Sequence, residues 1–147
     1  MKLRQLSLFL ENRPGQLRAP CEALGRAGID ILTMSLADTA QFGILRLIVK
    51  DWERARAVLE AAGMVVNVAE VLPVEVDDRP GGLAAALMAL EQAGVGVEYM
   101  YAFAAGPRPG KAAIVFRFDD AGRAAAALRE RGLRVLEAEE LLGNKSM

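Results

Sequence analysis

Apolar and polar residues alternate over residues 3–11, so that Leu6, Leu8 and Leu10 share one face of a predicted strand. From Leu17 the apolar spacing changes to that of a helix with one buried face. Read in this way, the first half of the chain predicts a strand over 3–11, a helix from about 16 to 28, strands over 29–38 and 44–50, a helix over 52–63 and a strand over 64–71. The order βαββαβ is that of the ferredoxin-like fold.

The same order then starts again. A constant offset pairs Arg13 with Arg79 and Gly28 with Gly94. After a longer second hairpin the offset grows slightly and pairs Asp51 with Asp120. A long repeat that spans the whole chain indicates duplication of one unit. We therefore expect an α+β fold with two ferredoxin-like units, each an antiparallel sheet with helices on one face. The expected domains are residues 1–71 and 72–147, the second with a short helical tail over 137–142.

Aromatic residues alternate along the second strand of the second unit, at Tyr99, Tyr101 and Phe103. Their counterparts in the first unit lie opposite the inferred core face. We therefore expect an exposed apolar row on the helix-free face of the sheet, suited to a homodimer or a ligand contact. Ordinary packing against the tail or the hairpin is the alternative.

Composition narrows the possible functions. Hydrophobic residues make up 53% of the 147 residues and the net charge is −1, which predicts a packed core and gives no basic surface for nucleic acid or a membrane. One cysteine and no histidine argue against a zinc site and against histidine-based catalysis, so we expect no metal, no cofactor and no catalytic residue. The N-terminal residues lack signal-peptide features, which favours a cytoplasmic protein.

Both strand-to-helix turns carry the sequence Arg-Pro-Gly, within residues 11–17 and 77–83. The amides that open the following helix suit a carboxylate, because they are free N–H donors at the positive end of the helix dipole. In the first turn these are the amides of Gly15, Gln16 and Leu17, and in the second those of Gly81, Gly82 and Leu83. Backbone carbonyls with Asn12 or Asp78 are candidates to accept hydrogen bonds from an ammonium group. A purely structural turn remains the alternative for each.

These motifs resemble the ACT domain family of small-molecule-binding regulatory modules. The resemblance rests on the two [Asn/Asp]-Arg-Pro-Gly-x-Leu turns and on the Ala-Gly passages at residues 27–31 and 93–97. More narrowly, residues 42–46 and 98–103 resemble small stand-alone bacterial proteins made of two ACT domains.

The resemblance implies a non-catalytic regulatory module that binds a free L-amino acid at the turns and the domain interface. It adds residues of the second strand of each unit as pocket lining, because in ACT-like assemblies the turn of one domain faces that strand of a neighbour. The candidate ligand-binding residues are Asn12, Arg13, Pro14, Gly15, Gln16, Leu17, Met34, Ser35, Asp78, Arg79, Pro80, Gly81, Gly82, Leu83, Met100 and Tyr101. A homodimer is the expected assembly, with a metabolic enzyme as a further partner. The alternative function is an interaction subunit of an enzyme in which ligand binding is vestigial.

Overall fold

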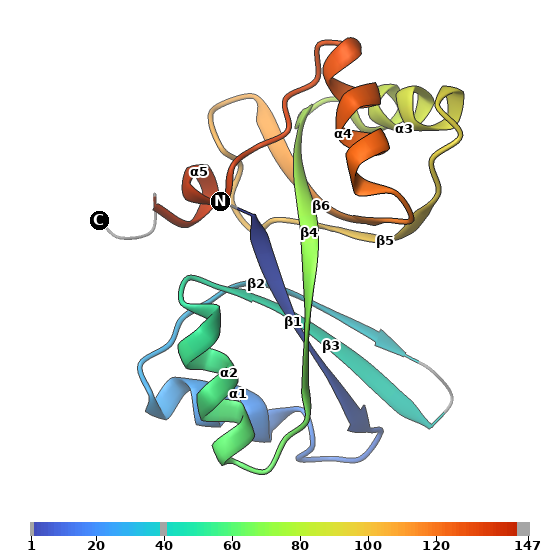
Figure 1. Cartoon of the computed structure of the whole chain (residues 1–147). Helices are drawn as coiled ribbons and strands as arrows, with labels where there is room; N and C mark the ends of the chain where they lie inside the picture. The colour runs from blue at the N-terminus through green and yellow to red at the C-terminus, as the bar shows by residue number, and fades with distance from the viewer. Residues whose placement is uncertain (1, 39–40, 144–147) are drawn as a thin grey trace. The chain divides into compact units, whose positions relative to one another are not determined.

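The structure is a computed structural model that describes residues 2–38 and 41–143. The chain forms two compact units (Figure 1). The first unit contains residues 4–69, and the second contains the start of the chain up to Leu3 together with the residues from Glu70 onward. The elements in chain order are β1 (Leu3–Glu11), α1 (Arg18–Arg26), β2 (Ile31–Asp38), β3 (Phe42–Val49), α2 (Trp52–Ala61), β4 (Val66–Asp77), α3 (Gly82–Gln92), β5 (Val97–Ala102), β6 (Lys111–Phe118), α4 (Ala121–Glu130) and α5 (Ala138–Leu142).

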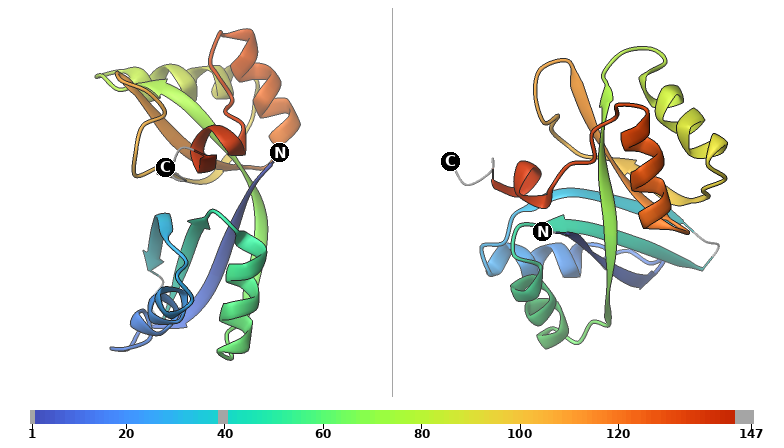
Figure 2. Two further views of the ribbon diagram at one scale, coloured as in Figure 1. Left: turned by 90° about the vertical axis from the view of Figure 1, so that its left-hand side faces the viewer. Right: turned by 45° about the horizontal axis from the view of Figure 1, so that its top comes forward.

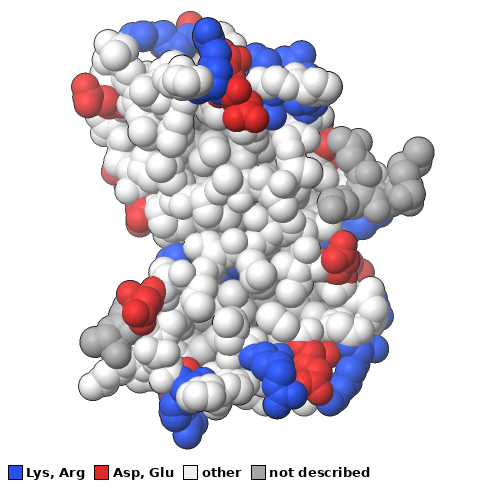
Figure 3. Space-filling view, turned by 180° about the vertical axis from the view of Figure 1, so that it is seen from behind, with Lys and Arg blue, Asp and Glu red and all other residues white. Residues whose placement is uncertain are grey.

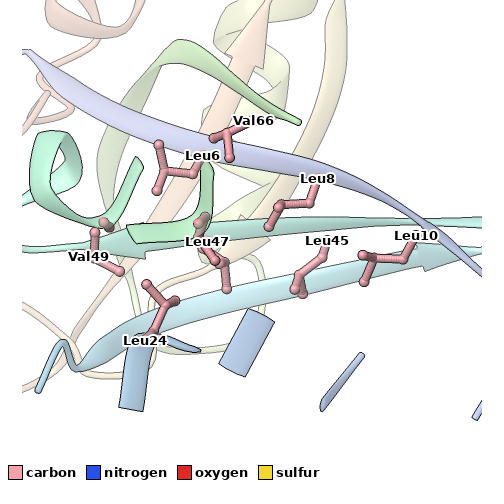
Figure 4. Packing of buried hydrophobic residues seen from close by; sticks show 10 residues of the cluster. Leu6, Leu8, Leu10, Leu24, Leu45, Leu47, Val49 and Val66 are labelled. Carbon is pink, nitrogen blue, oxygen red and sulfur yellow. The ribbon is translucent and has the colours of Figure 1, made fainter. Parts of the chain in front are cut away.

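The first unit has the strand order β2-β3-β1-β4, and β3 pairs antiparallel with both β1 and β2. The alternation in β1 turns Leu6, Leu8 and Leu10 toward one buried cluster, where Leu45 and Leu47 of β3 meet them (Figure 4). Leu24 of α1 and Leu59 of α2 close this cluster from the helical layer. The predicted buried face of the first strand is therefore confirmed.

The second unit repeats this plan with the strand order β4-β6-β5. Helices α3 and α4 lie on the same side of its sheet (Figure 2). Its core gathers around Phe116 and Phe118, whose rings stack with centroids 5.0 Å apart. The α+β fold of two ferredoxin-like units with helices on one face is confirmed. On the side shown in Figure 3, charged side chains of the second unit gather mainly at its helix-bearing end.

The start of the second helix is built identically in both units. Asp51 accepts a hydrogen bond from the Arg54 amide at 3.2 Å, and Asp120 accepts one from the Arg123 amide at 3.1 Å. Both aspartates occupy the N-cap position, where a side-chain oxygen pairs with an amide that has no partner inside the helix. This agreement supports the alignment of the two halves in which Asp51 corresponds to Asp120.

The last strand of the first unit and the first strand of the second form one continuous strand, β4. The sequence suggested two separate strands. Between Val68 and Val76 no turn residue other than Pro73 interrupts the chain, and a proline remains compatible with extended backbone.

The final strand of the second unit is much reduced. It consists of an isolated bridge between Val74 and Val135, supported by a hydrogen bond from the Glu75 amide to the Arg134 carbonyl at 2.9 Å. The chain then enters α5, which Glu137 and Glu140 stabilise through a capping box. The predicted helical tail is confirmed.

The expectation of an exposed aromatic row was wrong. Phe103 is only 7% exposed, so the aromatic row at Tyr99, Tyr101 and Phe103 is not a row of exposed rings. The two tyrosines are half-buried. Conversely, Met34 and Leu36 pair with the buried Leu47 and Leu45 and so point to the core face, yet each is 55% exposed. They lie on β2, the outer strand of the first unit.

Candidate functional site

The first strand-to-helix turn surrounds a hollow of about 480 Å³. Five of the six candidate residues in this turn line it, and Gln16 does not. The hollow also includes residues that the sequence did not single out. Its full lining is Leu10, Glu11, Asn12, Arg13, Pro14, Gly15, Leu17, Leu36, Asp38 and Gly43.

Backbone hydrogen bonds set the shape of this turn. The Arg13 amide donates to the Glu11 carbonyl at 2.8 Å, and the Gln16 amide donates to the Arg13 carbonyl at 3.2 Å. Gly15 adopts a φ of +89°, a conformation that other residues adopt at a cost. The Gln16 amide is thus used inside the turn. The amides of Gly15 and Leu17 donate to no backbone carbonyl among the described residues.

The arginines of both turns fold back onto an acid two residues earlier. Arg13 Nε lies 2.8 Å from Glu11 Oε2, and Arg79 Nη2 lies 3.1 Å from Asp77 Oδ2. Lys111 also binds Asp77, and this hydrogen bond is the main reason that the pKa of Asp77 is lowered. The acid-x-Arg spacing in the sequence is the signal from which these ion pairs could have been found.

The second turn is tighter than the first. A Cβ atom placed on Gly82 would stand 1.9 Å from the carbonyl oxygen of Asp77, so only glycine fits there. Gln16 occupies the equivalent place in the first turn and is half-buried. Helix α3 therefore begins at Gly82, whereas α1 begins at Arg18, two residues later in register. The two turns share a left-handed glycine, with φ of +89° at Gly15 and +87° at Gly81, and equivalent backbone hydrogen bonds. They differ in the close approach at Gly82 and in where the helix begins.

None of the candidate residues on the second strands lines the hollow. Met34 and Ser35 precede Leu36 on β2, and only Leu36 lines it. Leu36 packs over Gly43, where an added Cβ would stand 3.2 Å from Leu36 Cδ1. In the second unit, Met100 is exposed and Tyr101 is half-buried on β5. Sequence alternation placed Met34 and Leu36 on the same face, but it could not show which of them reaches the turn.

Sequence reasoning also missed a charged cluster in the second unit. Glu75 on β4 is 4% exposed and receives hydrogen bonds from Arg108 Nη2 at 2.8 Å and from Arg134 Nη1 at 3.2 Å. Arg134 also binds Glu140 at 2.7 Å. The hydrogen bond from Arg108 is the largest cause of the lowered pKa of Glu75, and burial opposes it. The cluster joins the β5–β6 hairpin and the tail to β4.

The described part of the chain offers neither an evident metal site nor a membrane-spanning helix. Within residues 2–38 and 41–143, no group of three or more Cys, Asp and Glu side chains is placed to hold a metal ion. No helix in these ranges is long and apolar enough to cross a membrane.

Comparison with known proteins identifies the family of this chain. The family model of the ACT domain pair matches residues 1–144. A protein of Bacteroides thetaiotaomicron is similar in its crystal structure, with 35% sequence identity, a TM-score of 0.87 and coverage of 97% of this chain and 96% of that one. A comparison with curated proteins finds no significant match.

More distant structures share the fold. The regulatory subunit of aspartate kinase from Thermus thermophilus, in its ligand-free form, is 18% identical with a TM-score of 0.64, over 90% of this chain and 92% of that one. Aspartate kinase from Synechocystis is 23% identical with a TM-score of 0.59, and the match covers 92% of this chain but 26% of the enzyme. Together with the family match, the tandem units and their paired Arg-Pro-Gly turns show that the chain belongs to the ACT domain pair family.

Proposed function

We propose that this protein is a non-catalytic regulatory module that binds a free L-amino acid at the first strand-to-helix turn. The observation that carries the proposal is the composition of the hollow. It brings together backbone amides without a backbone acceptor, two carboxylates and an apolar wall, which are the three kinds of group that an amino acid requires. Its volume falls within the usual range for small-molecule sites, roughly 300–1,000 Å³.

Each part of an amino acid has a matching group in the hollow. The amides of Gly15 and Leu17 precede α1 and suit the α-carboxylate. The carboxylate of Asp38 suits the ammonium group, since Glu11 is already paired with Arg13. Leu10 and Leu36 offer an apolar contact for the ligand side chain. This arrangement favours an amino acid with an apolar or aromatic side chain.

The second turn and the candidate residues of the second strands contribute to ligand binding when two chains associate. We propose a cytoplasmic homodimer in which the turn of one unit faces the second strand of another, so that Met34, Ser35, Met100 and Tyr101 contact the ligand of a neighbouring turn. In this proposal residues 78–83 form the second copy of the site. The aspartate kinase subunits with the same fold support a metabolic enzyme as the partner that reads the amino-acid level.

A melting assay with the twenty amino acids tests the proposal. A ligand that binds only the native state raises the midpoint temperature of unfolding, Tm, in proportion to the logarithm of its concentration above the dissociation constant. We expect one or a few amino acids to raise Tm at millimolar concentration. Absence of any shift would refute ligand binding.

Two matched variants locate the site. Leu36 and Met88 are almost equally exposed, but only Leu36 lines the hollow, and Met88 is not among the candidate site residues. Leu36→Ala should weaken the amino-acid response, whereas Met88→Ala should leave it unchanged. Equal effects would place the ligand elsewhere.

One observation favours a second candidate function. Gly82 packs directly against the Asp77 backbone, which leaves the second turn less open than the first. A subunit that binds an enzyme without needing a ligand would tolerate such a loss. Stable complex formation with the enzyme in the absence of amino acids, together with an unchanged Tm across the panel, would favour this second function.

A further inference from the structure

A second hollow, of about 420 Å³, lies within the second unit, and no residue of either turn lines it. Its walls come from β4, β6 and α4 and from the chain that leads into α5. Apolar side chains dominate these walls, with Leu72, Phe116 and Phe118 on the sheet and Val135 and Leu136 on the tail. The helix contributes only small residues to the apolar wall, Ala121, Gly122 and Ala125.

The internal repeat shows why the hollow is open. In the alignment of the two halves, Ala121 takes the position that Trp52 holds in the first unit, directly after the N-cap aspartate. Trp52 packs against the first hydrophobic core, and the guanidinium of Arg4 lies 5.6 Å from the centroid of its ring. In the same alignment, Glu70 takes the place of Arg4. The pair that fills this place in the first unit is therefore missing from the second.

The reduced final strand widens the same space. In the first unit, β4 lies beside β1 as a full strand, whereas the second unit has only the bridge between Val74 and Val135 at the equivalent edge. Small helix residues and a short strand together leave Leu72, Ala125 and Val135 only half-buried. Such apolar surface gains free energy when an apolar group covers it.

Three cationic and two acidic side chains line the hollow. Lys2 pairs with Glu70 at 3.3 Å, and Arg117 pairs with Glu98 at 3.4 Å and donates to the Glu70 carbonyl at 2.8 Å. Glu137 caps α5. Arg129, at the C-terminal end of α4, has no ion pair among residues 2–38 and 41–143. One guanidinium thus stands beside an apolar hollow.

We infer that this hollow is a second ligand site, which takes a small carboxylic acid with an aromatic or branched apolar body. The apolar body covers Leu72, Ala125 and Val135, and the carboxylate pairs with Arg129. A guanidinium binds a carboxylate through two parallel hydrogen bonds, which fixes the orientation of the ligand at the rim. The site is independent of the amino-acid site proposed for the first turn and requires no ammonium group on the ligand.

Phenylacetate and its neutral analogue phenylacetamide test the charge requirement. We expect phenylacetate to raise Tm and to bind in isothermal titration calorimetry at millimolar concentration. Phenylacetamide should bind about tenfold more weakly, because it cannot form the charged pair with Arg129. No binding of phenylacetate, or equal binding of the two compounds, would overturn the inference.

Substitution by the residue of the first unit tests the location. Ala121→Trp should fill the hollow as Trp52 does in the first unit, and phenylacetate binding should be lost. Arg129→Gln should weaken phenylacetate binding about tenfold, while Arg123→Gln on the same helix, outside the hollow, should not change it. Full binding by a folded Ala121→Trp protein would refute the site.

If Ala121→Trp does not fold, the two arginine variants decide the matter, and equal affinity in both would refute the site. The rise in Tm with amino acids, which tests the first turn, is measured on the same Arg129→Gln protein. Phenylacetate binding tests this inference and the rise in Tm with amino acids tests the proposed function, so failure of one is distinguishable from failure of the other.

Discussion

Replacement of Glu75 by Gln tests the charged cluster of the second unit most directly. The Glu75 carboxylate is almost fully buried and accepts three hydrogen bonds, from Arg108 at 2.8 and 3.2 Å and from Arg134 at 3.2 Å. Gln keeps the shape but offers one oxygen acceptor and turns an NH₂ donor toward a guanidinium. At least one contact therefore becomes a clash of two donors.

The expected loss is about 2 kcal/mol in the free energy of unfolding. A hydrogen bond to a charged group contributes roughly 1.5–3 kcal/mol, and the lower part of this range applies because both arginines remain about half exposed to water. For a chain of this size such a loss lowers Tm by roughly 4–8 °C. The control is Glu98→Gln, which removes an exposed partner of Arg117 and should change stability by less than about 0.5 kcal/mol.

The lowered pKa of Glu75 also predicts how this difference in stability changes with pH. The folded pKa of Glu75 lies below its ordinary value of 4.5, so its ionised form stabilises the native state at neutral pH. This contribution is complete above the unfolded pKa and disappears as the pH falls through the lower folded pKa. Urea unfolding of the native protein and of Glu75→Gln should differ at neutral pH and converge in acid. A difference that is absent at neutral pH, or that persists undiminished in acid, would refute the reasoning.

Four further substitutions probe the scaffold. Gly82→Ala should cost about 3 kcal/mol or more, because its Cβ would clash with the Asp77 carbonyl oxygen; a folded variant with native Tm would contradict the tight turn. Asp51→Ala and Asp120→Ala should each cost about 1 kcal/mol in urea unfolding, and clearly unequal losses would show that the two caps are not equivalent. Leu47→Ala removes a fully buried side chain from the first core and should cost about 2–5 kcal/mol, so a loss below about 1 kcal/mol would argue against that packing.

Periodicity predicted the fold well because each face of these elements meets a different environment. The alternation at Leu6, Leu8 and Leu10 identified the buried face of β1, and the internal repeat paired Asp51 with Asp120, which cap equivalent helices. The offset between the halves predicted the second unit from the first. In these places local chemistry and tertiary packing favour the same arrangement.

Exposure was predicted less well because it depends on the position of a strand in its sheet. Leu36 has the alternation of a core residue, but β2 is the outer strand of the first unit and Leu36 is 55% exposed. Phe103 follows β5, yet its ring is buried. Period-two patterns report which residues share a face, and they carry no information about what lies over that face.

The candidate site also has features that the sequence determined and features that only the tertiary structure decided. The Arg-Pro-Gly turns, their duplication and the absence of histidine chemistry follow from the sequence alone, because turn geometry and residue chemistry are local properties. Only the tertiary structure decided that Leu36 and Asp38 join the first turn, that Gly82 narrows the second, and that Ala121 leaves open the space that Trp52 fills. A hollow is lined by residues distant in the chain, and it exists only where no side chain fills the space between them.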